Sequence, residues 1–156
     1  MNIEKIKNLR GKLRILEREE GGVFEEPEGC CGLTTAQCHT LLEIGSRGQV
    51  SLVDLAAALG LDASTLSRTI QGMVMQCLVS RQPNDKDRRY VVISLTEHGR
   101  KVFSEIEDRY NGYIARVLGL LPADKQETIL ESIGAFADAV LKLKETESCC
   151  DEGERA

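Results

Sequence analysis

The sequence predicts a mainly α-helical fold that carries one small β-hairpin. In most segments the apolar residues recur three and four positions apart, which is the period of a helix face, and only residues 78–95 alternate with the period of strands. The chain has 156 residues, of which 42% are hydrophobic. That is enough to bury a core without disulfides or metal, so we expect one compact domain whose fold requires no cofactor.

An amphipathic helix is predicted from Asn2 to about Glu19. Its apolar residues form one stripe, which needs a partner to cover it: Ile3, Ile6, Leu9, Leu13 and Leu16. We expect Gly21 and Gly22 to end this helix, because glycine is a poor helix former. Residues 23–32, with two Gly, one Pro and three Glu, have the composition of a loop.

Three short helices are predicted next. The second helix starts at Thr34 or Thr35, which can cap it, and runs to residues 45–46. A short extended piece at 49–51 precedes the third helix, residues 52–59, which Gly60 ends. The fourth helix begins at residues 64–65, and its apolar face extends to Leu78.

The hairpin and two further helices complete the chain. The hairpin leads out at 78–81, turns at a polar tip, residues 83–89, and returns at 90–95. Thr96 caps a long helix, which Leu121 and Pro122 interrupt, and a last helix runs from about Ala123 to Lys144. The polar tail, residues 148–156, has no internal reason to fold.

The charge of the chain is unevenly distributed. The net charge is −5, but residues 62–101 contain seven Lys or Arg and four Asp or Glu, a local charge of +3. Phosphate binding depends on the local field and not on total charge. An acidic protein with one basic segment is therefore compatible with binding duplex DNA.

Residues 52–78 have the arrangement of a helix-turn-helix. Ala56 provides a small residue in the first helix, Gly60 lies where the chain must turn, and both helices have an apolar face. The exposed face of the second helix offers groups that suit base edges and phosphates: Ser64, Thr65, Ser67, Arg68, Thr69 and Gln71. Taken alone, this face is equally typical of an ordinary solvated helix.

The tip of the hairpin supports the DNA-binding interpretation. It places Lys86, Arg88 and Arg89 within four positions of an exposed turn, directly after the helix-turn-helix. Cations beside a recognition helix can contact backbone phosphate or enter the adjacent minor groove. We expect Asp85 and Asp87 to orient these side chains. The hairpin is thus predicted to be the wing of a winged helix-turn-helix.

These motifs make the sequence resemble the MarR family of transcriptional regulators, from Leu33 to about Phe103 most clearly. The matching segments are LTTAQ (33–37), LVDLAAALG (52–60), STLSRTI (64–70), DKDRR (85–89) and SLTEHG (94–99). The resemblance implies a homodimer formed by N- and C-terminal dimerisation helices, which binds a pseudo-palindromic operator in double-stranded DNA and responds to an effector. It also implies that Ser64, Thr65, Ser67 and Arg68 contact bases or phosphates, and that Arg88 and Arg89 are the wing cations.

The six cysteines fall into two groups. Cys38 and Cys77 lie on apolar stripes and are expected to be small buried residues. The adjacent pairs Cys30, Cys31 and Cys149, Cys150 lie on no such stripe. Each pair can offer two thiolates to a soft ion, so we expect a metal or metalloid effector, such as As(III), Cd(II), Zn(II) or Cu(I). Redox sensing through the same thiols and an aromatic small-molecule effector remain alternatives, as does a tail whose cysteines have no role.

The sequence as a whole predicts a cytoplasmic, DNA-binding regulator, most simply a repressor released from its operator by the effector. The expected parts are residues 1–32 (first dimerisation helix and loop), 33–100 (winged helix-turn-helix), 101–147 (C-terminal dimerisation helices) and 148–156 (tail). No motif of an enzyme is present, and no apolar run is long enough for a membrane span. A helical module that binds protein instead of DNA is the remaining alternative.

Overall fold

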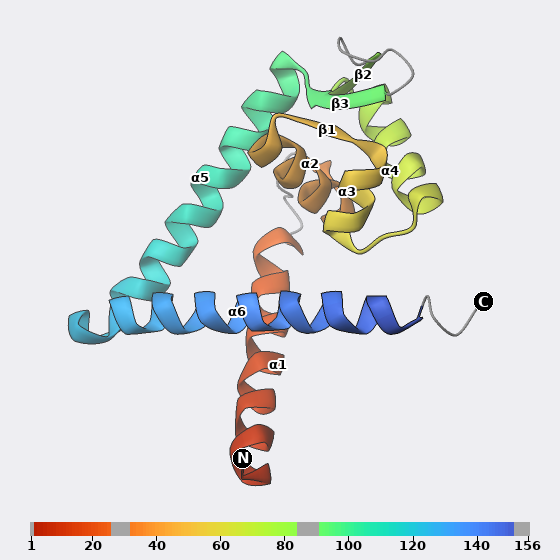
Figure 1. Cartoon of the computed structure of the whole chain (residues 1–156). Helices are drawn as coiled ribbons and strands as arrows, with labels where there is room; N and C mark the ends of the chain where they lie inside the picture. Colours follow the sequence, from red (N-terminus) through yellow and green to blue (C-terminus); the bar gives the residue numbers. More distant parts are fainter. Residues whose placement is uncertain (1, 26–31, 84–90, 152–156) are drawn as a thin grey trace. The chain divides into compact units, whose positions relative to one another are not determined.

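The computed structural model contains six helices and three strands in the part of the chain that it describes (Figure 1). It describes the backbone of residues 2–25, 32–83 and 91–151, and side-chain environments for 2–19, 32–83, 91–144 and 146. The elements are α1 (Ile3–Glu25), α2 (Thr35–Arg47), β1 (Gln49–Ser51), α3 (Leu52–Leu59), α4 (Ala63–Met75), β2 (Val79–Pro83), β3 (Val91–Leu95), α5 (Glu97–Gly119) and α6 (Ala123–Asp151). They form two compact units, residues 1–110 and 111–156. The predicted mainly helical fold with a hairpin is confirmed.

Local signals fix the boundaries of α2 and α3. Thr34 forms a capping box with Gln37, in which each side chain accepts a hydrogen bond from the other residue's backbone N–H. The Ser51 hydroxyl caps α3 by accepting from the Asp54 N–H. Gly60 ends α3 in the left-handed conformation that glycine adopts without strain (φ 64°, ψ 32°). The helix limits predicted for this region are therefore confirmed to within a residue or two.

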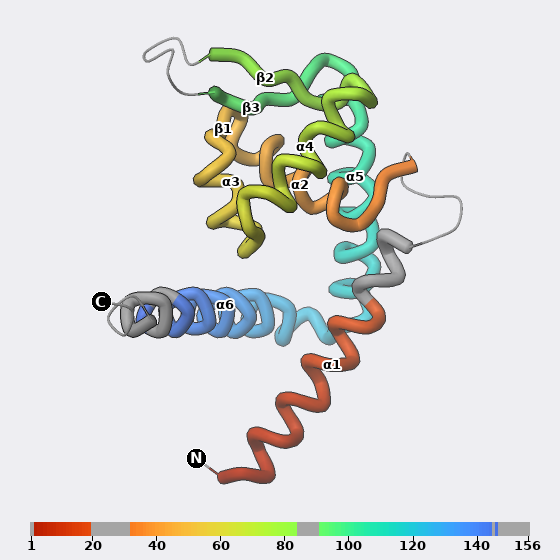
Figure 2. Tube along the Cα trace, turned by 90° about the vertical axis from the view of Figure 1, so that its right-hand side faces the viewer, coloured from red at the N-terminus to blue at the C-terminus, as the bar shows by residue number. Residues whose placement is uncertain are grey.

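The three strands form one antiparallel sheet in the order β1, β3, β2. Ile93 of β3 pairs with Val50 of β1 on one side and with Arg81 of β2 on the other. The sheet lies against the cluster of α2, α3 and α4 (Figures 1 and 2). The hairpin β2–β3 is the predicted wing, and β1 adds the predicted short extended piece to it.

A single apolar core holds these elements together. It receives side chains from α2, α3, α4, α5 and all three strands: Cys38, Leu41, Ile44, Val50, Leu55, Ala56, Leu66, Ile70, Met73, Leu78, Val79, Ile93, Leu95, Val102 and Ile106. All of them are at most 7% exposed. Because α4 contributes Leu66, Ile70 and Met73 on one side, its opposite side is fixed facing outward.

The start of α5 is bound tightly to the end of the helix-turn-helix. The Thr96 hydroxyl donates to the carbonyl of Cys77 at 2.6 Å and accepts from the Gly99 N–H at 2.9 Å. Gly99 approaches so closely that a Cβ there would lie 1.9 Å from the Leu78 carbonyl oxygen. Only glycine fits at this contact, so Gly99 allows α5 to pack directly on the turn that follows α4.

Two predicted helix ends are wrong. The first helix continues through Gly21 and Gly22 and ends at Glu25, so residues 23–25 of the predicted loop are helical. A glycine costs a helix only about 1 kcal/mol relative to alanine, which a long helix can absorb. The last helix runs beyond Lys144 to Asp151 and so includes the start of the segment predicted to be a tail without structure.

The helices α1 and α6 expose long apolar stripes. Both stripes have the same spacing along the helix, and every member is at least 37% exposed: Ile3, Ile6, Leu9, Leu13 and Leu16 on α1, and Leu130, Ile133, Phe136, Val140 and Leu143 on α6. A search of the described residues for a helix long and apolar enough to span a membrane finds none. The two stripes are exposed apolar faces of these helices.

Candidate nucleic-acid interface

The outward side of α4 presents a continuous polar face. Ser64, Thr65, Arg68 and Gln71 are exposed, and Ser67 is partly buried beside them. Residues three and four apart lie on the same side of a helix, so these groups share one face. The structure thus places together the four α4 residues predicted to contact DNA, on the side opposite to the core.

Asp62, which the sequence interpretation overlooked, caps this helix. The predicted start at residues 64–65 is late: α4 begins at Ala63, with Asp62 as its N-cap. One carboxylate oxygen of Asp62 accepts from the Ser64 hydroxyl at 2.6 Å and from the Thr65 N–H at 2.8 Å. The hydrogen bonds from the Ser64 and Thr65 side chains, followed by that from the Thr65 backbone, hold the pKa of Asp62 well below its usual range. An aspartate directly before a helical apolar pattern is a helix N-cap signal, so Asp62, which precedes Ala63 and Leu66, could have been recognised.

Arg81 connects the wing to α4 and was also missed. It lies on β2, and its Nη2 donates to the backbone carbonyl of Ser67 at 3.2 Å. The side chain is exposed, so its remaining donors face solvent. No local motif distinguishes this arginine, because its role arises only when the hairpin packs beside α4.

Most of the other predicted site residues lie outside the part of the chain whose side chains the structure describes. This holds for the wing cations Lys86, Arg88 and Arg89 and for the thiols of Cys30, Cys31, Cys149 and Cys150. A search of the described residues alone finds no group of three His, Cys, Asp or Glu able to hold a metal. The wing contact and the thiolate site therefore stay predictions.

The two cysteines of the apolar stripes differ from each other. Cys38 is buried as predicted, but Cys77 is exposed, and the prediction for it is wrong. The helix ends before Cys77, which takes left-handed backbone angles (φ 58°), while the Leu78 N–H bonds back to the Met73 carbonyl at 2.9 Å. This helix ending turns the Cys77 side chain outward and buries Leu78 in its place.

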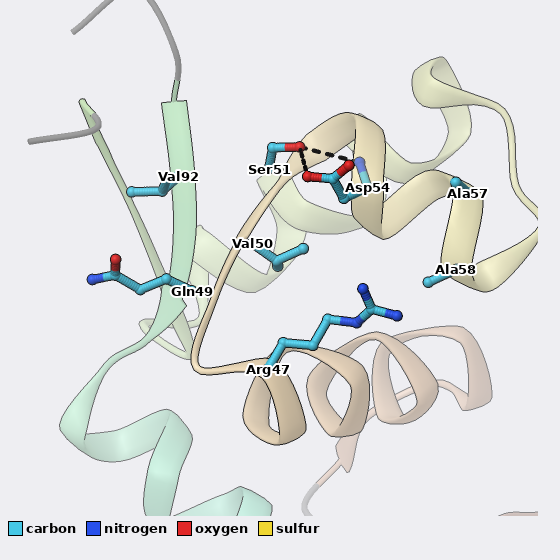
Figure 3. Close-up of a pocket in the computed structure, with 8 residues that line it drawn as sticks. All are labelled: Arg47, Gln49, Val50, Ser51, Asp54, Ala57, Ala58 and Val92. Carbon is cyan, nitrogen blue, oxygen red and sulfur yellow. Dashed lines mark hydrogen bonds between the residues drawn. The ribbon is translucent and has the colours of Figure 1, made fainter. Parts of the chain in front are cut away.

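One open cleft lies beside α3, with a volume of about 680 Å³ (Figure 3). Its wall is formed by the end of α2, by β1, α3 and β3, and includes Arg47, Val50, Ser51 and Asp54. Its charged side chains are already paired: Arg47 with Glu43 at 2.5 Å, and Asp54 with the Ser51 hydroxyl at 2.7 Å. Among the described residues of this wall, the pairing leaves no charged group that requires a ligand, so we assign the cleft no role.

Similarity to known proteins agrees with this geometry. Residues 32–89, which include α2, α3, α4 and β2, match the model of the MarR family. The HTH-type transcriptional regulator BilQ of Clostridium symbiosum is 24% identical over 116 residues, which cover 72% of this chain and 81% of that protein. The region that matches the family model, residues 32–89, thus contains the helix-turn-helix.

Solved structures share the fold. The C80S mutant of MarR from E.coli, complexed with operator DNA, has a TM-score of 0.68 and 21% identity, covering 87% of this chain and 98% of that one. FabT of Streptococcus pneumoniae, in complex with DNA, has a TM-score of 0.73 and 14% identity, covering 91% and 99%. The similarity thus extends well beyond the helix-turn-helix.

Fold and exposed α4 face together define a winged helix-turn-helix regulator of transcription. The family model that matches residues 32–89 and the regulators among the relatives agree with each other: this chain is similar to the MarR family of transcriptional regulators. The predicted resemblance to this family is confirmed. The matched relatives are regulators of transcription, which agrees with the prediction that the chain is not an enzyme.

Proposed function

We propose that this regulator inserts α4 into the major groove of its operator and reads base edges with Ser64, Thr65, Ser67 and Arg68. The observation that carries the proposal is the polar outward face of α4, which the core residues on the opposite side fix in place. Hydroxyl groups and one arginine suit both base edges and phosphates. The wing, with Lys86, Arg88 and Arg89, contacts the DNA backbone or the minor groove next to α4.

The regulator acts as a homodimer on a pseudo-palindromic site. The apolar stripes of α1 and α6 support this, because a monomer would leave ten large apolar side chains in water: Ile3, Ile6, Leu9, Leu13, Leu16, Leu130, Ile133, Phe136, Val140 and Leu143. Pairing of two chains brings two α4 helices to successive half-sites, about 34 Å apart. The two-fold symmetry of such a dimer matches the symmetry of a pseudo-palindrome.

The test is a measurement of DNA affinity against salt concentration, using the duplex upstream of the chain's own gene. Arg68→Ala is expected to weaken binding at least about tenfold and to lower the slope of log affinity against log salt by about one. Lys12→Ala, which removes an exposed cation of α1, is the matched control and should change neither. Salt-independent binding, or equal behaviour of both variants, would instead favour a module that binds protein.

The effector that we propose is a thiophilic metal or metalloid held by Cys30, Cys31, Cys149 and Cys150. Sequence supports this choice: the two pairs of adjacent thiols lie on no apolar face, and soft ions such as As(III), Cd(II), Zn(II) or Cu(I) prefer thiolate ligands. Binding of the ion shifts the dimer helices, changes the separation of the two α4 helices and releases the operator, so the protein acts as a repressor.

A titration of the DNA complex with each of these ions tests the effector. Release of DNA by one ion at stoichiometric concentration, abolished when all four cysteines are changed to serine, is the expected result. Release by peroxide that needs the same cysteines would indicate thiol redox sensing. If the serine variant and the wild type respond alike to every ion and to peroxide, the cysteines have no role, and aromatic small molecules become the effectors to screen.

A further inference from the structure

The first turn of α4 contains a hydroxyl whose hydrogen-bond direction is fixed. Asp62 accepts the Ser64 hydroxyl proton at 2.6 Å with the same carboxylate oxygen that accepts the Thr65 N–H at 2.8 Å. A serine hydroxyl has one proton and two lone pairs. While this bond persists, Ser64 can only accept further hydrogen bonds.

Asp62 has no proton to give back to Ser64. Hydrogen bonds from the Ser64 and Thr65 side chains and from the Thr65 backbone keep the pKa of this carboxyl well below its ordinary range. At neutral pH it is a carboxylate, which accepts and does not donate. The direction of the bond, from Ser64 to Asp62, is therefore determined, and a hydroxyl that donates to an anion becomes a better acceptor itself.

The major groove distinguishes between donors and acceptors. Adenine and cytosine present an amino group there, whereas guanine and thymine present carbonyl oxygens. A hydroxyl that can only accept forms a hydrogen bond with an amino group. Facing a carbonyl oxygen, it places lone pair against lone pair, which is unfavourable. A free serine hydroxyl, by contrast, rotates and accommodates either kind of base.

We propose that Asp62 is a positioning residue that commits Ser64 to accept a hydrogen bond, so that Ser64 selects an adenine or cytosine amino group in each half-site. The inference rests on the proposed function, in which α4 lies in the major groove. Asp62 itself touches no base. Its carboxylate also occupies the N-terminal end of α4, where a DNA phosphate would otherwise bind, so α4 contacts the DNA through its side chains.

The experiment begins with the full-length protein and a library of random duplexes, from which the preferred sequence is selected. In that sequence each adenine is then replaced by purine, and each cytosine by 2-pyrimidinone, which lack the amino group. At one position per half-site we expect wild-type affinity to fall about fivefold, the effect of one net hydrogen bond. Ser64→Ala should bind both duplexes equally at that position.

The Asp62 variants test the positioning role. Asp62→Asn keeps an oxygen that can accept from Ser64 and cap α4, so we expect the same base preference with higher affinity for all duplexes, because a negative charge near DNA is removed. Asp62→Ala frees the Ser64 hydroxyl, so guanine or thymine at that position should be tolerated. Thermal unfolding and helix content of each variant show whether α4 remains folded.

The outcomes separate this inference from the proposed function. If the wild type selects a sequence and Arg68→Ala weakens binding, but Ser64→Ala keeps the full sensitivity to the amino group, only the inference about Ser64 is overturned. If Asp62→Ala keeps the wild-type preference, the positioning role of Asp62 is overturned. If the wild type selects no sequence at all, both the proposed reading by α4 and this inference fail.

Discussion

The guanidinium of Arg81 donates a hydrogen bond to the backbone carbonyl of Ser67 over 3.2 Å, and so ties the base of the wing to the middle of α4. We expect Arg81→Ala to weaken operator binding about fivefold, because the wing and α4 then lose their common orientation and one charge-assisted hydrogen bond. The salt slope should stay unchanged, since the group acts on the protein and not on phosphate. Titrations at several salt concentrations measure both quantities.

Arg68→Ala is the variant with which Arg81→Ala is compared, because loss of the Arg68 side chain is expected to lower the salt slope by about one. An equal reduction of the slope in Arg81→Ala would show that Arg81 contacts phosphate. The role of Arg81 in orienting the wing would then be wrong.

Gly99 cannot accept a side chain. In Gly99→Ala the new Cβ would lie 1.9 Å from the Leu78 carbonyl oxygen, so α5 or the turn after α4 must move. We expect a loss of about 2 kcal/mol or more in the free energy of unfolding, as found for overpacked sites. Chemical denaturation monitored by circular dichroism gives this free energy.

Gly112→Ala is the matched control, because Gly112 lies in the same helix and, beyond its own stretch of that helix, no described residue has an atom within 4 Å of a Cβ added there. Alanine at position 112 should leave the free energy of unfolding at the wild-type value or raise it by up to about 1 kcal/mol. If both substitutions have the same effect, the close approach of Gly99 to Leu78 does not limit stability.

The fold was predictable because its signals are local and agree with one another. The apolar periodicity, the Thr34 capping box and Gly60 each indicate the same boundaries as the structure. The prediction for Cys77 failed because periodicity was extended past a helix end. Cys77 continues the apolar spacing of α4, but the left-handed backbone at that residue turns its side chain out to solvent.

The site was predictable only in part. The polar face of α4 follows from its helical period, so Ser64, Thr65 and Arg68 could be chosen from sequence. The link between Arg81 and Ser67 joins residues from two elements, and no single-sequence pattern encodes such a pairing. The effector hypothesis rests on adjacent cysteines alone, for which spacing suggests thiolate chemistry without identifying a ligand.

The Asp62 cap should make stability depend on pH in a defined direction. A carboxyl whose pKa is lowered by folding stabilises the folded state above its ordinary pKa of 3.8, and the effect is lost as pH falls through the lowered value. We expect wild type to have a higher melting temperature than Asp62→Asn by a constant amount between pH 7 and pH 5, a range well above 3.8. The difference in melting temperature between the two proteins should shrink only below pH 5.

The Asp62 titration can also be observed directly by NMR of its carboxyl carbon. Ser64→Ala removes the side-chain hydrogen bond that lowers the pKa of Asp62 most, and so should raise this pKa towards its ordinary value. An Asp62 pKa that is the same in both proteins would contradict the hydrogen bond on which the orientation of Ser64 depends.

A single charge introduced into the apolar stripe of α6 should dissociate the proposed dimer into monomers. Ile133 and Phe136 are 59% and 42% exposed in the single chain. In Phe136→Glu, dimerisation would bury an unpaired carboxylate, so we expect a monomer at micromolar concentration. Light scattering measures the mass, and affinity for a duplex with two half-sites should fall more than about tenfold, because the second α4 no longer binds in the same complex.

Lys142→Glu is the control for the α6 stripe. At about 100° per residue, Lys142 lies on the side of α6 opposite to Ile133, Phe136 and Val140, so a charge change there should leave the dimer intact. A wild-type chain that is monomeric at the same concentration would contradict the proposed homodimer. If wild type is dimeric and Phe136→Glu remains so, the dimer does not bury the α6 stripe, and the equivalent substitution Leu9→Glu tests whether α1 alone holds the two chains together.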